Sequence, residues 1–316
     1  MNEIQPLQTT EIQRLVVDAM DYARQSRAPA TLKAYQSDWR LFEEFCDSHR
    51  LRALPAEPSS VVLFITKLAE THRPSSIQRK LAAISVAHKT GGMPSPIAAE
   101  VVHSTMAGVR RAKGMAKTQK SPIRARHLRE GLSLMRSDMK GVRDTAIILV
   151  SYAGALRRSE VAGLDLADLT FSPEGVVLLL NRSKTDQDGA GVKVAIKAGN
   201  RTDTCPVRAL KNWISVAKLS DGALFRPITR GGRVGGTRLT DQTVCAIFKE
   251  FALLLGLDPK DYGGHSGRAG VITDGFAASV AQAVIAKHSR HRSHAISDYL
   301  REATLFDQNL SGLVGL

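Results

Sequence analysis

The chain has 316 residues, with 44 Lys and Arg against 30 Asp and Glu, so its formal charge is +14. This charge predicts a polyanionic partner, and 43% hydrophobic residues are typical of a globular chain with room for two domains. No apolar run approaches the ~20 residues that span a bilayer, so no membrane partner is expected. The polar N-terminus and three scattered cysteines, Cys46, Cys205 and Cys245, exclude a signal peptide, a zinc pattern and a disulfide framework, which favours the cytoplasm.

The first part of the chain, residues 1–112, is predicted to be a helical domain. One stretch repeats apolar residues every three or four positions, which marks one helix face: Leu32, Tyr35, Trp39, Phe42 and Cys46. Thr31 is the expected cap of this helix. Two more helices are predicted to start at Pro58 and Pro74. The aromatic stripe is interpreted as core packing, in preference to a surface for base stacking.

A basic linker is predicted over residues 113–125. It lies in a longer basic stretch without an acidic interruption, whose candidate DNA-binding residues are Arg110, Arg111, Lys113, Lys117, Lys120, Arg124 and Arg126. Such runs are often only solvated connections. In a chain this basic, a strap along a DNA backbone is at least as well supported, and its contribution would fall steeply with salt.

The second part, residues 126–316, has a mixed pattern. Two β-type runs, at 176–180 and 192–196, flank the turn-rich residues 186–191. Helices are predicted near 127–137, 142–153, 206–217, 240–255, 266–276 and 279–287. The glycine-rich stretch 229–236 is predicted to be a loop, because no nucleotide-binding pattern accompanies it.

Four segments of this second part carry side chains suited to phosphodiester chemistry. Residues 155–160 contain Arg157, the run between the strands contains Lys184, residues 263–270 contain His265 and Arg268, and Tyr299 lies near the C-terminus. Arginine contacts phosphate oxygens bidentately, so two arginines from distant segments can clamp one phosphate. Histidine and lysine transfer protons, and a phenol becomes nucleophilic when cations stabilise its phenolate.

These segments, in this order, resemble the tyrosine recombinases of the phage integrase family, on its Cre-like and Xer-like side. The resemblance covers nearly the whole chain. It implies a mainly α fold with a small β-sheet in the C-terminal domain, in which a helical core-binding domain is followed by a mixed α+β catalytic domain. It also implies roles: Arg157, His265 and Arg268 act on the scissile phosphate, Lys184 protonates the leaving 5′-oxygen, and Tyr299 forms a 3′-phosphotyrosyl intermediate.

Further positions follow from the same resemblance. Glu160 matches an acidic residue that supports the site without touching the phosphate. His291 matches a phosphate-contacting histidine, with His288 as the alternative, and Arg290 stands where the family usually has glycine. Three more side chains compete for assigned roles: Arg158 with Arg157, and Lys193 and Lys197 with Lys184.

The resemblance implies double-stranded DNA with inverted-repeat sites as the partner. It also implies a homotetramer on two duplexes, in which the apolar C-terminal segment docks on a neighbouring subunit, although the segment could instead pack within its own domain. No cofactor, ATP or metal is implied, and no acidic cluster points to a metal. Such a protein would be associated with the nucleoid.

The function predicted is therefore site-specific DNA recombination. Two alternatives use the same fold: a DNA-binding architectural protein that has lost its chemistry, and a type IB topoisomerase that relaxes supercoils. A basic polymer-binding protein without catalysis would leave the ordered spacing of the motifs unexplained. The separate helical part and the short apolar tail favour recombination over relaxation.

Overall fold

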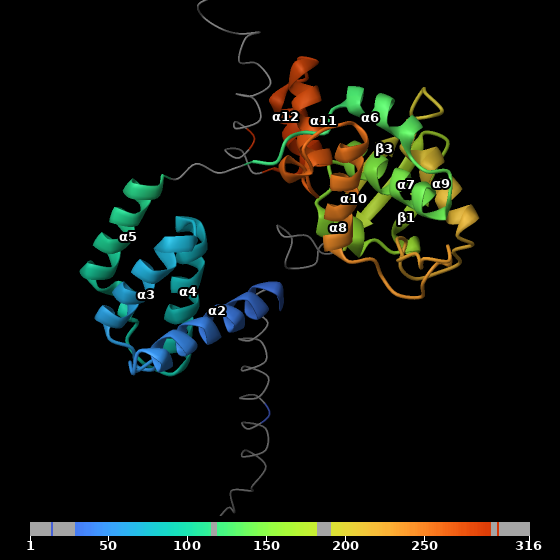
Figure 1. The fold of residues 1–316 in the computed structure, drawn as a ribbon. Helices are drawn as coiled ribbons and strands as arrows, with labels where there is room; N and C mark the ends of the chain where they lie inside the picture. The colour runs from blue at the N-terminus through green and yellow to red at the C-terminus, as the bar shows by residue number, and fades with distance from the viewer. Residues whose placement is uncertain (1–13, 15–28, 115–118, 182–190, 292–295, 297–316) are drawn as a thin grey trace, which may run out of the picture. The chain divides into compact units, whose positions relative to one another are not determined.

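The computed structural model describes residue 14 and residues 29–114, 119–181, 191–291 and 296. The chain divides into two compact units, Met1–Lys117 and Thr118–Leu316 (Figure 1). Each unit has its own hydrophobic core. None of the helices in these described ranges is long and apolar enough to cross a membrane.

The first unit is helical throughout its described part. Its elements are α2 (Pro29–Ser48), α3 (Pro58–Thr71), α4 (Pro74–Thr90), a short 3-10 helix (Pro96–Ala98) and α5 (Glu100–Lys113). Helix α2 packs on α4, and α3 packs on α5. The predicted starts at Pro58 and Pro74 are confirmed. The predicted cap at Thr31 is wrong, because α2 already begins at Pro29, where proline loses no helical hydrogen bond.

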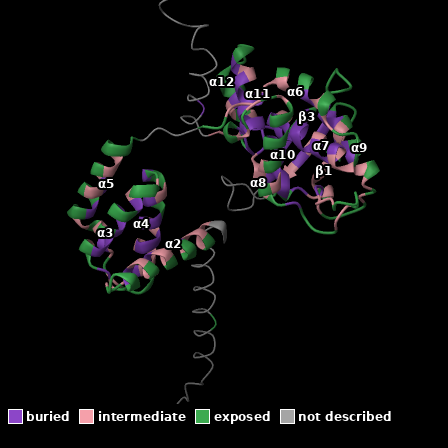
Figure 2. Cartoon of the chain, viewed as in Figure 1, coloured by how far each residue is buried: buried purple, intermediate pink, exposed green. Residues whose placement is uncertain are grey.

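Aromatic side chains form the centre of this unit, as the sequence predicted. The rings of Phe42 and Phe64 meet edge to face with centroids 5.1 Å apart, and Trp39 lies 5.7 Å from Phe42. Buried residues lie on the facing sides of α3 and α4, and exposed residues on their outer sides (Figure 2). The stripe is therefore core.

The second unit combines ten described helical segments with one sheet. The α-helices are α6 (Ala125–Gly131), α7 (Met139–Ala153), α8 (Arg158–Gly163), α9 (Pro206–Val216), α10 (Asp241–Leu254), α11 (Ser266–Ala277) and α12 (Gln282–Ser289). Short 3-10 helices are Leu132–Leu134, Leu166–Asp168 and Pro259–Asp261. All six helices expected from the sequence are present, while the six-residue α8 was not predicted.

The sheet has three antiparallel strands in the order β1 (Leu169–Phe171), β2 (Gly175–Leu180) and β3 (Val192–Lys197). Its register pairs Leu178 with Leu169 on one side and with Val194 on the other. Alternate residues of β2 and β3 are buried, as period-two strands over a core require. The two predicted strands are confirmed, and β1 is an addition.

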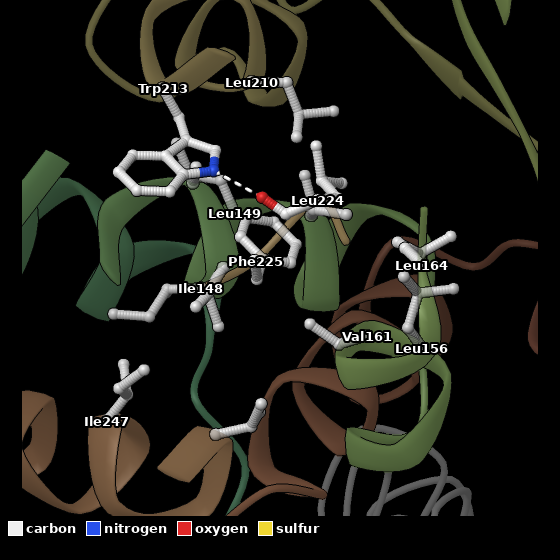
Figure 3. Packing of buried hydrophobic residues seen from close by; sticks show 14 of the residues in the cluster. Ile148, Leu149, Leu156, Val161, Leu164, Leu210, Trp213, Leu224, Phe225 and Ile247 are labelled. Atoms are coloured by element: carbon white, nitrogen blue, oxygen red, sulfur yellow. Dashed lines mark hydrogen bonds between the residues drawn. The ribbon is translucent and has the colours of Figure 1, made fainter. Parts of the chain in front are cut away.

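The core of the second unit is packed around α7. Trp213 of α9 lies over Leu149 of α7 and Phe225, and its indole N–H donates to the carbonyl of Leu224 at 2.8 Å (Figure 3). Helix α7 also packs against α11. This packing places the turn between α7 and α8 close to the start of α11. The candidate site lies there.

Candidate active site

Arg157 is held at the start of α8 by the carboxylate of Glu160. Glu160 accepts hydrogen bonds from the backbone N–H of Arg157, at 2.8 Å, and from its guanidinium. Burial alone would raise the pKa of Glu160, but the charge of Arg290 and the bonds from Arg157 lower it below its usual value. The carboxylate is therefore ionised at neutral pH, and it orients Arg157.

Arg268 lies in the first turn of α11 and is buried, with 3% of its surface exposed. Its guanidinium donates to the carbonyl of Ala155, at the end of α7. His265 caps the same helix and is exposed. This arrangement needs small residues nearby, because a Cβ on Gly264 would lie 2.7 Å from the Cβ of Arg158.

His291 follows α12 and lies against Arg268. An Nη of Arg268 is 3.2 Å from Nδ1 of His291, and the Oγ of Ser289 is 2.9 Å from the same nitrogen. Burial, together with the charge of Arg268 and other nearby cations, lowers the pKa of His291 to about 4. The ring is therefore neutral at pH 7, with one donor and one acceptor nitrogen.

These side chains share one open pocket of about 310 Å³, lined by Gln119, Lys120, Arg157, His265, Arg268, Ala269 and His291. Four of the six catalytic candidates from the sequence line it. In a concave site with two guanidinium groups and two imidazoles, the two non-bridging oxygens of one phosphodiester can each be bound by a cation. Within the described residues, no group of three His, Cys, Asp or Glu could hold a metal ion.

The remaining candidates lie elsewhere or outside the described residues. The Nε2–H of His288 donates to the carbonyl of Ala153 at 2.8 Å, and His288 does not line the pocket. Lys193 and Lys197 lie on the exposed face of β3, also away from the pocket. Lys184 and Tyr299 fall outside the described residues.

The seven candidate DNA-binding residues occupy different settings. Arg110, Arg111 and Lys113 belong to the last turn of α5. Lys120 lines the pocket and donates to the carbonyl of Lys260. The others are Arg124, which pairs with Asp274, exposed Arg126, and Lys117, which lies outside the described residues.

Residues 121–125 form a short segment, here called the strap, that is hydrogen-bonded to α11 and to the residues just before it. The sequence did not predict these contacts. The backbone N–H groups of Ser121 and Ile123 donate to the carbonyls of Asp261 and Ser266, at 2.8 and 2.9 Å. Asp274 accepts from Arg124 and from the N–H of Ala125. The second half of the predicted linker is therefore bonded to the second unit, which carries Gln119 and Lys120 to the pocket.

Sequence reasoning also missed the contacts of Arg290, which donates to Glu160 at 2.8 Å. One feature of the sequence indicated that Arg290 is unusual: it stands where the family resemblance expects glycine.

Comparison with known proteins places this site in a family. The model of the phage integrase family matches residues 123–303. An integrase/recombinase XerD homolog from Selenomonas ruminantium is 36% identical over 306 residues, covering 94% of this chain and 89% of the relative. The chain belongs to the phage integrase family. It is thus a tyrosine-recombinase-type enzyme, and the predicted family is confirmed.

Two further matches extend the similarity across both units. Recombinase Cre of Escherichia phage P1 is 25% identical over 291 residues, covering 86% of this chain and 83% of Cre. A lambda integrase tetramer bound to a Holliday junction matches with a TM-score of 0.57 at 16% identity, over 94% of this chain and 81% of that one. The structural match supports the predicted two-domain, mainly α fold with a small sheet.

Proposed function

We propose that this protein cuts and rejoins DNA at specific sites through a 3′-phosphotyrosyl intermediate formed by Tyr299. The observation that carries the proposal is the convergence of Arg157, His265, Arg268 and His291 on one pocket. Those residues come from three separate segments between positions 157 and 291, and the family match covers all of them. Two arginines facing one pocket supply the charge that a pentavalent phosphorus needs.

In the proposed step, the phenolic oxygen of Tyr299 attacks the scissile phosphorus and gives its proton to a base, for which His265 is the candidate. The bond from phosphorus to the 5′-oxygen breaks, and Lys184 protonates the leaving oxygen. Arg157 and Arg268 bind the non-bridging oxygens, while neutral His291 donates a hydrogen bond and His265 assists the proton transfer. One phosphoester replaces another, so the reaction needs no ATP, metal or cofactor.

The other tyrosines of the second unit support this choice of nucleophile. Burial and the Asp274 carboxylate raise the pKa of Tyr152 far above its usual value, and burial raises the pKa of Tyr262. Neither phenol lines the pocket. Both are therefore poorly suited to form a phenolate, which leaves Tyr299 as the candidate within residues 118–316.

We further propose that residues 1–112 form a clamp domain that binds the DNA, that residues 126–316 form the catalytic unit, and that residues 113–125 connect the two. The partner would be double-stranded DNA with inverted-repeat sites, bound by a tetramer on two duplexes as in the lambda integrase tetramer on its Holliday junction. A DNA-acting enzyme of this kind would work in the cytoplasm at the nucleoid. The charge of +14 supports a nucleic-acid partner.

A plasmid exchange assay tests the function. The substrate would carry two copies of the DNA that flanks the native gene, in buffer with EDTA and without ATP. Exchange of the flanking markers is the expected result. Relaxation without exchange would indicate a topoisomerase, and tight binding without cleavage an architectural protein, and either result would contradict the proposal.

A further inference from the structure

Arg290 follows the last residue of α12 and precedes the pocket residue His291, but it does not line the pocket itself. Its side chain is 9% exposed, and it bonds to a carboxylate of Glu160 at 2.8 Å. It also donates to the carbonyls of Gly154, Ala155 and His288, at 3.2, 3.1 and 3.1 Å. One guanidinium thus joins three separate segments: the α7–α8 turn, α8 and the end of α12.

The backbone at this position favours a different residue. Arg290 has φ 57° and ψ 40°, the left-handed conformation that usually ends a helix with glycine. A residue with a Cβ adopts this conformation at a cost, because its Cβ comes too close to the following carbonyl oxygen. In addition, Nε of Arg290 is the buried side-chain nitrogen that lacks a hydrogen-bond partner among the described residues. Ending the helix therefore does not explain the arginine.

The groups that Arg290 holds are the same groups that hold the pocket arginines. Glu160 accepts from Arg157 and Arg290 together. The carbonyl of Ala155 accepts from Arg268 and Arg290 together. Ala155 is itself left-handed, with φ 47°, so two unfavourable backbone positions meet through one hydrogen bond. Strain at such a meeting point is a recurrent mark of a functional site.

A purely stabilising role fits these observations less well. Burying an ion pair is weak support for stability, because desolvation offsets the attraction. Glycine would end α12 without strain and without a buried unpaired N–H. The contacts of Arg290 instead converge on the supports of Arg157 and Arg268, and His291 is its sequence neighbour.

We infer that Arg290 is a positioning residue: it fixes Glu160 and the turn at residues 154–155 against the end of α12, so that Arg157, Arg268 and His291 keep the arrangement that binds the scissile phosphate. The inference rests on the proposed function. The guanidinium matters for its planar fork, which reaches four acceptors on three segments, and a lysine ammonium cannot reproduce that geometry.

The test compares Arg290→Gly and Arg290→Lys with the wild type, and Arg201→Ala serves as control because Arg201 forms an exposed ion pair with Asp203. Single-turnover cleavage of a nicked suicide substrate is measured at saturating DNA, with the DNA Kd and Tm of each variant. Arg290→Gly is expected to slow cleavage by about tenfold to a hundredfold, as small misplacements do, with Kd within about threefold. Arg290→Lys should be intermediate, and the control unchanged.

Two measurements distinguish a positioning role of Arg290 from a purely stabilising one. Guanidinium ion added at millimolar concentration should restore part of the cleavage rate of Arg290→Gly. In a double-mutant cycle, the effects of Arg290→Gly and Glu160→Gln should be clearly less than additive, because both act in part through the Glu160 carboxylate. Wild-type cleavage by Arg290→Gly, or a loss without rescue that is additive with Glu160→Gln, would overturn the inference. If the wild type itself forms no adduct, the proposed function fails instead.

Discussion

Arg268 uses one guanidinium for two purposes, bonding the Ala155 carbonyl and facing His291 from within α11. We predict that Arg268→Lys lowers the single-turnover cleavage rate by about 10²–10³, as loss of an oxyanion donor does, because lysine cannot serve both directions. Arg157→Lys should behave similarly. Filter binding and cleavage on the same duplex measure both effects. A variant that cleaves within about threefold of wild type would exclude a clamp of two arginines.

His291 should make stability depend on pH. Its pKa falls from 6.5 to about 4 on folding, so between these values the unfolded chain takes up a proton that the folded protein does not. The free energy of unfolding should therefore fall as the pH is lowered through this window, by at most about 1.4 kcal/mol per pH unit. Urea denaturation of wild type and His291→Asn should show a shallower pH slope for the variant, and identical slopes would contradict the shift.

Arg157 and Arg268 could be predicted from the sequence, because binding a phosphate calls for arginine side chains. The sequence did not predict the contacts that hold them. Arg290 and Asp274 bind groups more than 100 residues away, and no local pattern encodes which distant carbonyl a side chain will reach. The structure also separates His291, which lines the pocket, from His288, which does not, a distinction the sequence left open.

At the scale of elements, the strap over α11 depends on Gly270. A Cβ there would lie 1.8 Å from the carbonyl oxygen of Ile123, so Gly270→Ala must displace the strap. We predict a loss of about 1–3 kcal/mol in stability, as for other overpacked sites, and slower cleavage because Lys120 moves away from the pocket. Gly236→Ala is the control, since nothing lies within 4 Å of its Cβ. Thermal unfolding measures the first effect, and equal Tm values for the two variants would refute it.

Long periodic elements were predictable from the sequence, and short ones were not. An initial proline and a clear apolar face indicate helices α3 and α4 in the sequence. By contrast, α8 has six residues and β1 has three, which is too few to show a period. What holds them are specific hydrogen bonds, from the N–H of Arg157 to Glu160 at the start of α8 and from β1 to the neighbouring strand β2.

For the whole molecule, binding to DNA should depend strongly on salt. If Arg110, Arg111 and Lys113 each neutralise one phosphate, their replacement by glutamine should reduce the slope of log K against log salt by about 0.9 per contact. Lys67→Gln is the control, because Lys67 already pairs with Glu70 on the exposed side of α3. Titrations between low and moderate salt give the slopes. An unchanged slope in the triple variant would remove the last turn of α5 from the DNA interface.

The central claim is that Tyr299 becomes covalently attached to DNA in the pocket of Arg157, Arg268 and His291. Wild type and Tyr299→Phe would be incubated with a nicked suicide substrate from the DNA that flanks the native gene, and denatured products would be mapped by mass spectrometry. The account predicts a 3′-phosphodiester on the peptide containing Tyr299 in the wild type, and in Tyr299→Phe no adduct but near-normal binding. An adduct on another residue, or one that persists in Tyr299→Phe, would contradict it.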